Sequence, residues 1–355
     1  MKKRYCFMDV IRLLSMAAIV FYHMVFALYL TGIRQLESVQ PMFENANMHI
    51  AKVGVGLFFM ISGAGLMLSL KDKEQLDLKA YYKKRFFRIL VPFYLVYILY
   101  LVIFMLLTHE SLASIYSNNP SPLTIIFTLL GMDAYVASFG FNTFSLGIGE
   151  WFLGALILMY IIFPFLRWAL RKNKYITLAV AVIYYIVILL TYPLMPFAST
   201  VPGYVNFTCK IMEFFLGMFI VTIIDQIPQW LSLGVSIPVI LFFLVCPFKV
   251  PINENLLVLI INICFFLLAM GLEGLFVKIP RVMKLVTFLC GYTYEFFLVH
   301  HVTINYITIQ HVGVPFSNMD VLLLFLEETV AIIILTILVK AILALPKFVR
   351  SHKHK

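Results

Sequence analysis

Charged residues are scarce in this chain of 355 residues. Only 12% of the residues are Asp, Glu, Lys or Arg, whereas 63% are hydrophobic. A soluble protein carries about twice that share of charge. Apolar runs near the ~20 residues that cross a bilayer recur along the whole sequence. The composition therefore argues against an ordinary soluble protein and predicts an all-α polytopic membrane protein.

Cysteines and catalytic signature motifs are also sparse. The five cysteines are scattered, mostly inside apolar runs, so we expect neither a disulfide framework nor a metal site. No Walker motif, HExxH, CxxC or GxSxG occurs in the sequence to indicate a rival chemistry. The first apolar run lacks a small-residue cleavage site, so we expect a retained first helix. We see no soluble domain, long linker or internal repeat, and we predict one integral-membrane domain over residues 1–355.

The hydrophobic runs predict about ten membrane-spanning helices. They cover 7–30, 50–70, 87–107, 150–168, 175–196, 207–225, 231–247, 254–276, 285–308 and 320–345. An eleventh candidate at 122–140 is weaker, because Gly131 and Asp133 interrupt its apolar run.

Positive charge decides the orientation. If "MKKR" starts in the cytoplasm and only the ten helices cross, the cytoplasmic segments hold 21 of the 27 Lys and Arg residues. A crossing at 122–140 would move about half of that charge outside, against the positive-inside rule. We therefore predict that both termini are cytoplasmic and that 122–140 is a re-entrant or interfacial outer segment. The net charge of +10 then reflects cytoplasmic loops of a cell-membrane protein rather than binding of nucleic acid.

The first helix carries an unusual polar stripe. Eleven residues separate Arg12 from His23, which places them about 20° apart on one helical face and roughly 16 Å apart along the axis. Asp9 falls on the same side. Ionisable groups inside a bilayer are costly, and each is a candidate functional residue. The alternative is that His23 is a core histidine bonded to a neighbouring helix.

Other ionisable residues fall at a similar depth in the outer part of the membrane. Glu213 and His300 lie inside apolar runs, and Glu150 opens a predicted helix. A histidine beside carboxylates can act as a general base with a pKa set by those neighbours. We therefore predict a catalytic group of His23, Glu150, Glu213 and His300. Two structural alternatives stay open: Glu150 as a helix N-terminal charge and Glu213 as a packing hydrogen bond.

A basic pair marks the cytoplasmic entry to the third helix. The stretch "YYKKRFFRILVP" places Arg85 and Arg88 on one helical face. Paired guanidinium groups bind phosphate bidentately, which favours a polyphosphorylated ligand from the cytosol. The alternative is an anchor for anionic lipid headgroups.

Several motifs, taken in order, resemble the integral-membrane acyltransferase family 3, whose members O-acylate cell-surface polysaccharides and related acceptors. The resemblance rests on Arg12 and His23 in the first helix and on the segments "GVGLFFMISGAGL", "RFFR", "EWFLGALILMYIIFP", "EFFLGMF" and "YEFFLVHH". It covers nearly the whole chain. One position departs from the pattern: many members carry an Asp where this sequence has Gly56, so that carboxylate cannot pair with the histidine here.

This resemblance implies a membrane-embedded O-acyltransferase. The donor would be acetyl-CoA, or another short acyl-CoA, approaching from the cytoplasm. Arg85 and Arg88 would hold its phosphates, with Arg12 assisting, and we group Asp9 with these donor-binding residues. His23 would activate an acceptor hydroxyl, and a glycan would enter from outside near Glu150, Glu213, His300 and 122–145. No metal is expected as a cofactor.

Alternatives of other classes stay open at this point. A proton-coupled transporter or a flippase of a polysaccharide precursor also carries intramembrane His and Glu, although inverted-repeat symmetry is lacking. A membrane sensor without catalysis is a third class. Within the acyltransferase, direct transfer is preferred over a covalent acyl-His or acyl-Ser62 intermediate. The sequence identifies neither the acceptor hydroxyl nor the oligomeric state.

Overall fold

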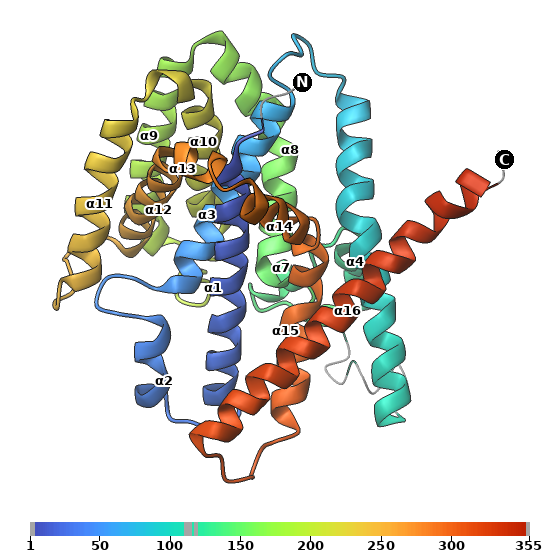
Figure 1. The fold of residues 1–355 in the computed structure, drawn as a ribbon. Helices are drawn as coiled ribbons and strands as arrows, with labels where there is room; N and C mark the ends of the chain where they lie inside the picture. Colours follow the sequence, from blue (N-terminus) through green and yellow to red (C-terminus); the bar gives the residue numbers. More distant parts are fainter. Residues whose placement is uncertain (1–3, 110–115, 117–119, 353–355) are drawn as a thin grey trace. The chain divides into compact units, whose positions relative to one another are not determined.

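A computed structural model describes residues 4–109, 116 and 120–352 of the chain, and this part is helical (Figure 1). Its only β-type pairing is an isolated bridge between Glu44 and His49. The longer helices are α1 Cys6–Leu30, α3 Ile50–Ser69, α4 Leu78–Thr108, α8 Glu150–Lys172, α9 Lys174–Thr191, α10 Phe207–Thr222, α11 Gln229–Val245, α12 Glu254–Gly271, α14 Pro280–Cys290, α15 Thr293–Ile309 and α16 Asn318–His352. Short helices connect them: α2 Leu36–Phe43, α6 Ile125–Leu129, α7 Asp133–Ala137, α13 Glu273–Val277, and the 3₁₀ turns η1 Pro122–Thr124, η2 Tyr192–Leu194 and η3 Ile224–Gln226.

Side-chain caps set the beginning of several helices. Asn173 accepts hydrogen bonds from the backbone amides at the start of α9, and Asn206 and Asn253 do the same for α10 and α12. At α3 the cap is His49, whose Nδ1 accepts from the Lys52 amide at 3.4 Å. Such caps satisfy amides that have no partner inside the helix.

The ten predicted spans all fall on helices of the structure. Seven of the described helices are long and apolar enough to cross a membrane, or eight if the bent pair α14–α15 counts as one span. The helices α10 and α11 are shorter, with 16 and 17 residues. The chain is therefore a helical, multi-pass membrane protein, while the count of ten and the sidedness of the termini stay predictions.

Two predicted helices are interrupted in the structure. The predicted helix 254–276 divides at Leu272 into α12 and α13. The predicted helix 285–308 is broken by Gly291 and Tyr292, so that α14 ends at Cys290 and α15 begins at Thr293. The ammonium of Lys340 on α16 donates to the Gly291 carbonyl at 2.6 Å, which satisfies an acceptor that the break leaves open. The segment 122–140 forms η1, α6 and α7, each too short to cross a bilayer.

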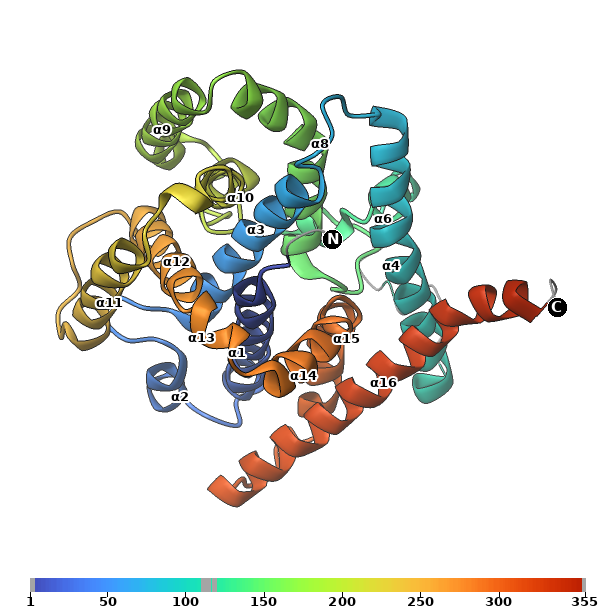
Figure 2. The same ribbon diagram turned by 45° about the horizontal axis from the view of Figure 1, so that its top comes forward.

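The described chain forms two compact units. Unit 1 comprises residues 1–22, 40–79 and 155–290. Within it, α10 lies between α9 and α3, and α12 lies beside both α3 and α11 (Figure 2). Glycines allow α3 and α10 to approach closely: a Cβ on Gly63 would lie 2.1 Å from the Phe214 carbonyl oxygen, and one on Gly217 would lie 2.0 Å from that of Met60. This helix contact depends on the absence of side chains at both positions.

Unit 2 comprises residues 23–39, 80–154 and 291–355. Its α15 packs against α16 (Figure 1). Two hydrogen bonds attach α15 to α4: Tyr100 donates to the Val299 carbonyl at 2.8 Å, and Tyr294 donates to that of Ile89 at 2.8 Å. These bonds fix the position of α15, which carries two consecutive histidines.

Candidate active site

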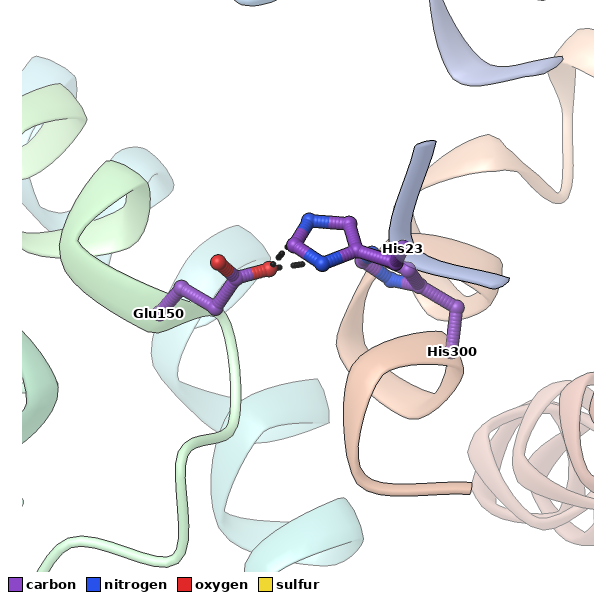
Figure 3. Close-up of side chains that lie close together, drawn as sticks. All are labelled: His23, Glu150 and His300. Atoms are coloured by element: carbon purple, nitrogen blue, oxygen red, sulfur yellow. Dashed lines mark ion pairs between the residues drawn. The ribbon is translucent and has the colours of Figure 1, made fainter. Parts of the chain in front are cut away.

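Three ionisable side chains of unit 2, those of His23, Glu150 and His300, lie close together (Figure 3). His23 Nε2 lies 3.1 Å from Glu150 Oε1, and their side chains are 14% and 18% exposed. His300 is fully buried, and its Nε2 lies 3.7 Å from the same carboxylate oxygen. Three of the four predicted catalytic residues, from three separate stretches of the chain, thus meet around one oxygen atom.

A glycine-rich turn aims the Glu150 carboxylate. Gly147 and Gly149 have φ values of +78° and +72°, which glycine adopts freely. Glu150 itself has φ of +46°, a left-handed conformation that is uncommon for a residue with a side chain. The buried Ile148 anchors the turn from inside. The stretch "LGIGEW" therefore holds a carboxylate at the first residue of α8 rather than continuing smoothly into the helix.

Buried contacts fix the orientation of His300. Its Nδ1 lies 2.6 Å from the Phe297 carbonyl oxygen, and because a carbonyl only accepts, Nδ1 carries the hydrogen. The neutral ring then has its lone pair on Nε2, which makes no hydrogen bond within the described residues. The ring of Phe297 packs edge-on against Phe152 at 5.1 Å between centroids, which supports this turn of α15 from the α8 side.

His301 is a fourth member of the site that the sequence reasoning missed. Its ring lies 4.9 Å from that of His23 between centroids, in an edge-to-face arrangement, while the His300 ring lies 5.2 Å away. The Asn305 amide lies 3.1 Å from its Nε2, and its Nδ1 faces the backbone of Gly147. The pair "HH" was the available signal, but only His300 was assigned to the site, from its expected depth in the membrane.

The arrangement sets the tautomer of His23. A carboxylate accepts but does not donate, so Nε2 of the neutral imidazole carries the hydrogen toward Glu150, and the lone pair lies on Nδ1. A carboxylate that holds a histidine in one tautomer, and stabilises its cation when it takes up a proton, is the arrangement of a general-base pair. The chemistry that fits is removal of a proton from a hydroxyl or another weak acid.

The predicted donor-binding residues Asp9 and Arg12 lie in unit 1. The carboxylate of Asp9 is buried and accepts from Arg4 Nη2 at 2.6 Å, from Thr287 Oγ1 at 2.9 Å and from Arg12 Nη1 at 3.4 Å. Asp9 therefore orients two guanidinium groups, Arg12 and the previously unassigned Arg4, rather than offering a free negative charge.

Glu213, the fourth predicted catalytic residue, also lies in unit 1. Its Oε1 lies 2.6 Å from Lys210 Nζ, and both side chains are almost fully buried. Its Oε2 makes no hydrogen bond to any described residue. The pairing with Lys210, one helical turn away, agrees with a packing role for Glu213. A buried carboxylate needs a partner that compensates for its lost hydration.

Arg85 and Arg88 lie near the beginning of α4 in unit 2. Arg88 is exposed, whereas Arg85 is half-buried, with its guanidinium carbon 5.9 Å from the centre of the Tyr81 ring. The two residues are three apart on one helix and share a face. Their exposure agrees with either of the roles considered for them, a phosphate site or a lipid anchor.

A family model described as an acyltransferase domain matches residues 6–345 of the chain. The matched region covers all of the site residues described above except Arg4. No curated protein and no solved structure matches the chain.

Proposed function

The chain belongs to this acyltransferase family, and on that premise we propose that it transfers an acetyl or other short acyl group from cytoplasmic acyl-CoA to a hydroxyl of an extracytoplasmic glycan. The observation that carries the proposal is the contact of 3.1 Å between His23 Nε2 and Glu150 Oε1. The contact supports a general base inside a helical membrane protein.

In the proposed reaction His23 removes the proton of the acceptor hydroxyl through its second ring nitrogen, Nδ1. The hydroxyl oxygen attacks the thioester carbonyl, the new C–O bond forms, and the C–S bond breaks. The proton passes from His23 to the leaving thiolate, so that the ester and free CoA are the products. Glu150 stabilises the imidazolium that exists between the two proton transfers. The reaction needs no metal ion.

Binding of the donor is assigned to the basic residues. Arg85 and Arg88 would bind the CoA phosphates, because guanidinium groups form paired hydrogen bonds with phosphate oxygens. Arg12 would assist them, oriented by its bond to Asp9. These roles rest on the family resemblance together with the exposure of Arg88. Substitution of either Arg85 or Arg88 by alanine should weaken CoA binding, and unchanged affinity would favour the lipid-anchor role.

The test of the catalytic role uses purified protein, radiolabelled acetyl-CoA and candidate glycans. His23→Gln should lower the formation of labelled product by about 10²–10⁴-fold while binding of CoA is retained, because only proton transfer is lost. The matched control is His311→Gln, which replaces a histidine just beyond α15, outside the site. An unchanged rate in His23→Gln would refute the general-base role.

A further inference from the structure

The three side chains in Figure 3 also have the chemistry of a metal site. Two imidazoles and one carboxylate are a ligand set that holds zinc in proteins, with an open fourth position. We propose that His23, Glu150 and His300 bind a divalent transition-metal ion of the zinc class, and that a bound ion blocks acyl transfer. The second half of this proposal rests on the proposed function, whereas the first half does not.

The spacing of the ligand atoms supports a site of this size. Metal–ligand bonds of about 2.0–2.1 Å in a tetrahedron place ligand atoms about 3.3 Å from one another. The observed separations from Glu150 Oε1 are 3.1 Å to His23 Nε2 and 3.7 Å to His300 Nε2. All three atoms lie within 4.8 Å of one another. Small side-chain rotations that bring the two imidazoles closer together would complete the triangle.

The orientation of His300 is the second argument. Its Nδ1–H is engaged by the Phe297 carbonyl, so a lone pair on the fully buried Nε2 faces a carboxylate oxygen, which is also an acceptor. Two acceptors that face each other across 3.7 Å repel, and a positive group between them would stabilise the pair. A backbone carbonyl that holds the distal nitrogen of a histidine is the usual support of a metal ligand.

Metal binding and proton transfer exclude each other at His23. As a base, the ring keeps its hydrogen on Nε2 and its lone pair on Nδ1. A metal ion bound at Nε2 displaces that hydrogen, because the nitrogen must offer its lone pair to the ion. The neutral ring then carries its hydrogen on Nδ1 and has no lone pair for the acceptor hydroxyl. The ion therefore inhibits by locking the wrong tautomer and by neutralising Glu150.

Direct binding of Co²⁺, followed by its visible absorption spectrum, tests the site in the full chain. The chain carries two further histidines near its C-terminus, so the measurement uses a background with His352→Gln and His354→Gln. In that background the protein should bind one Co²⁺ with the intense bands of tetrahedral coordination. His300→Gln and Glu150→Gln should each weaken the affinity at least 10-fold, whereas His311→Gln should leave it within about threefold. Absence of binding, or equal affinity in His300→Gln and the background protein, would overturn the site.

Inhibition is measured separately on the protein that transfers acyl groups. Zn²⁺ should abolish the transfer in the concentration range in which it displaces Co²⁺, and a chelator should restore it. Stoichiometric binding of Zn²⁺ with full activity would refute the blocking role. Binding of Co²⁺ by a protein that transfers no acyl group to any acceptor would instead contradict the proposed function while the metal site stands.

Discussion

At the scale of single residues, the backbone of Glu150 stands out. Its φ of +46° lies in the left-handed region, where a residue with a side chain is strained by about 1–2 kcal/mol. Gly147 and Gly149 in the preceding turn also have positive φ, which glycine adopts freely, so only Glu150 is strained there. The carboxylate is thereby placed against His23 at an energetic cost, as is common for functional groups.

Substitution of Glu150 should therefore separate stability from activity. Glu150→Gly relieves the strain, so its free energy of unfolding should exceed that of Glu150→Ala by about 1 kcal/mol. Both variants lose the carboxylate, and both should transfer acyl groups at least about 100-fold more slowly than the wild type. Thermal unfolding and the transfer assay, run on the same samples, measure the two effects. Equal stability of the Gly and Ala variants would mean that the turn carries no strain.

Asp133 gives a prediction about pH. Its side chain is 2% exposed, and burial raises the pKa of its carboxyl to about 7 from the ordinary 3.8. A raised folded-state pKa means that the neutral acid stabilises the fold, so this stability is present below about pH 4 and is lost as the pH rises through 7. Asp133→Asn mimics the neutral acid. Its melting temperature relative to the wild type should therefore be higher at pH 8 than at pH 4.5.

The control for this effect is Glu37→Gln, which removes an exposed carboxylate in unit 2. Its melting temperature relative to the wild type should be the same at both pH values. If Asp133→Asn behaved in the same way as this control, the burial of the Asp133 carboxyl would not influence stability.

An apolar run makes the few ionisable residues within it conspicuous in the sequence. His23 and His300 could be assigned because ionisable groups are rare inside a bilayer, and Glu150 because it opens a helix. The partners of two other residues were not assigned, although both are close in sequence. Lys210 pairs with Glu213, and Arg4 pairs with Asp9. Helical spacing allows the first pairing, but rotamers and local packing, which periodicity does not encode, decide whether such a pair forms.

At the scale of helices, small residues decide how closely two helices pack. Gly63 and Gly65 lie two residues apart on α3 but face different surroundings. A Cβ on Gly63 would lie 2.1 Å from the Phe214 carbonyl oxygen, whereas one on Gly65 would meet only the Met8 methyl at 3.5 Å. The first contact requires a shift of α10, and the second is ordinary van der Waals distance.

Alanine at these two positions should therefore have opposite effects. Gly63→Ala should destabilise the protein by about 1–3 kcal/mol or more, as overpacking does. Gly65→Ala should be neutral or stabilising by up to about 1 kcal/mol, because alanine favours a helix. Thermal unfolding in detergent compares the two variants directly. A Gly63→Ala protein as stable as Gly65→Ala would show that α3 and α10 do not pack through these glycines.

Helix positions follow from hydropathy more reliably than helix breaks do. The first helix and α3 begin and end within one residue of their predicted bounds, because long apolar runs have clear ends. The break at Gly291 and Tyr292 was not predicted, since the apolar pattern continues across it. A glycine weakens a helix without requiring a bend, and the Lys340 ammonium that satisfies the open carbonyl comes from α16, 49 residues further along the chain.

At the scale of the whole molecule, composition was enough to predict a helical membrane protein but not the number of crossings. The helices α10 and α11 have 16 and 17 residues, below the ~20 that span an unperturbed bilayer. A short span can be accommodated by local thinning of the bilayer. Helix length therefore does not decide whether α10 and α11 cross. The side of the membrane on which each connecting loop lies decides it.

Cysteine labelling decides the number of crossings. We predict that six helices cross between Lys73 and Lys278, an even number, so single cysteines at these two exposed positions should both react only from the cytoplasm. The number becomes odd if 122–140 crosses, or if one of α10 and α11 does not. Lys278→Cys is then exposed outside. Lys73→Cys is unchanged in either case and serves as the control. Each variant is made in a background without the five native cysteines, and an impermeant maleimide is applied to intact and permeabilised cells.

Two further positions separate the remaining cases. Phe141 is 63% exposed directly after the segment 122–140, and Phe141→Cys should react from outside, whereas a crossing at 122–140 would place it inside. Gln226 lies between α10 and α11 and is exposed, and Gln226→Cys should react only after permeabilisation. If neither helix crossed, Lys278→Cys would stay inside but Gln226→Cys would react from outside, because its loop would remain on the side from which α10 starts. The four positions together therefore distinguish ten crossings from eight, nine or eleven.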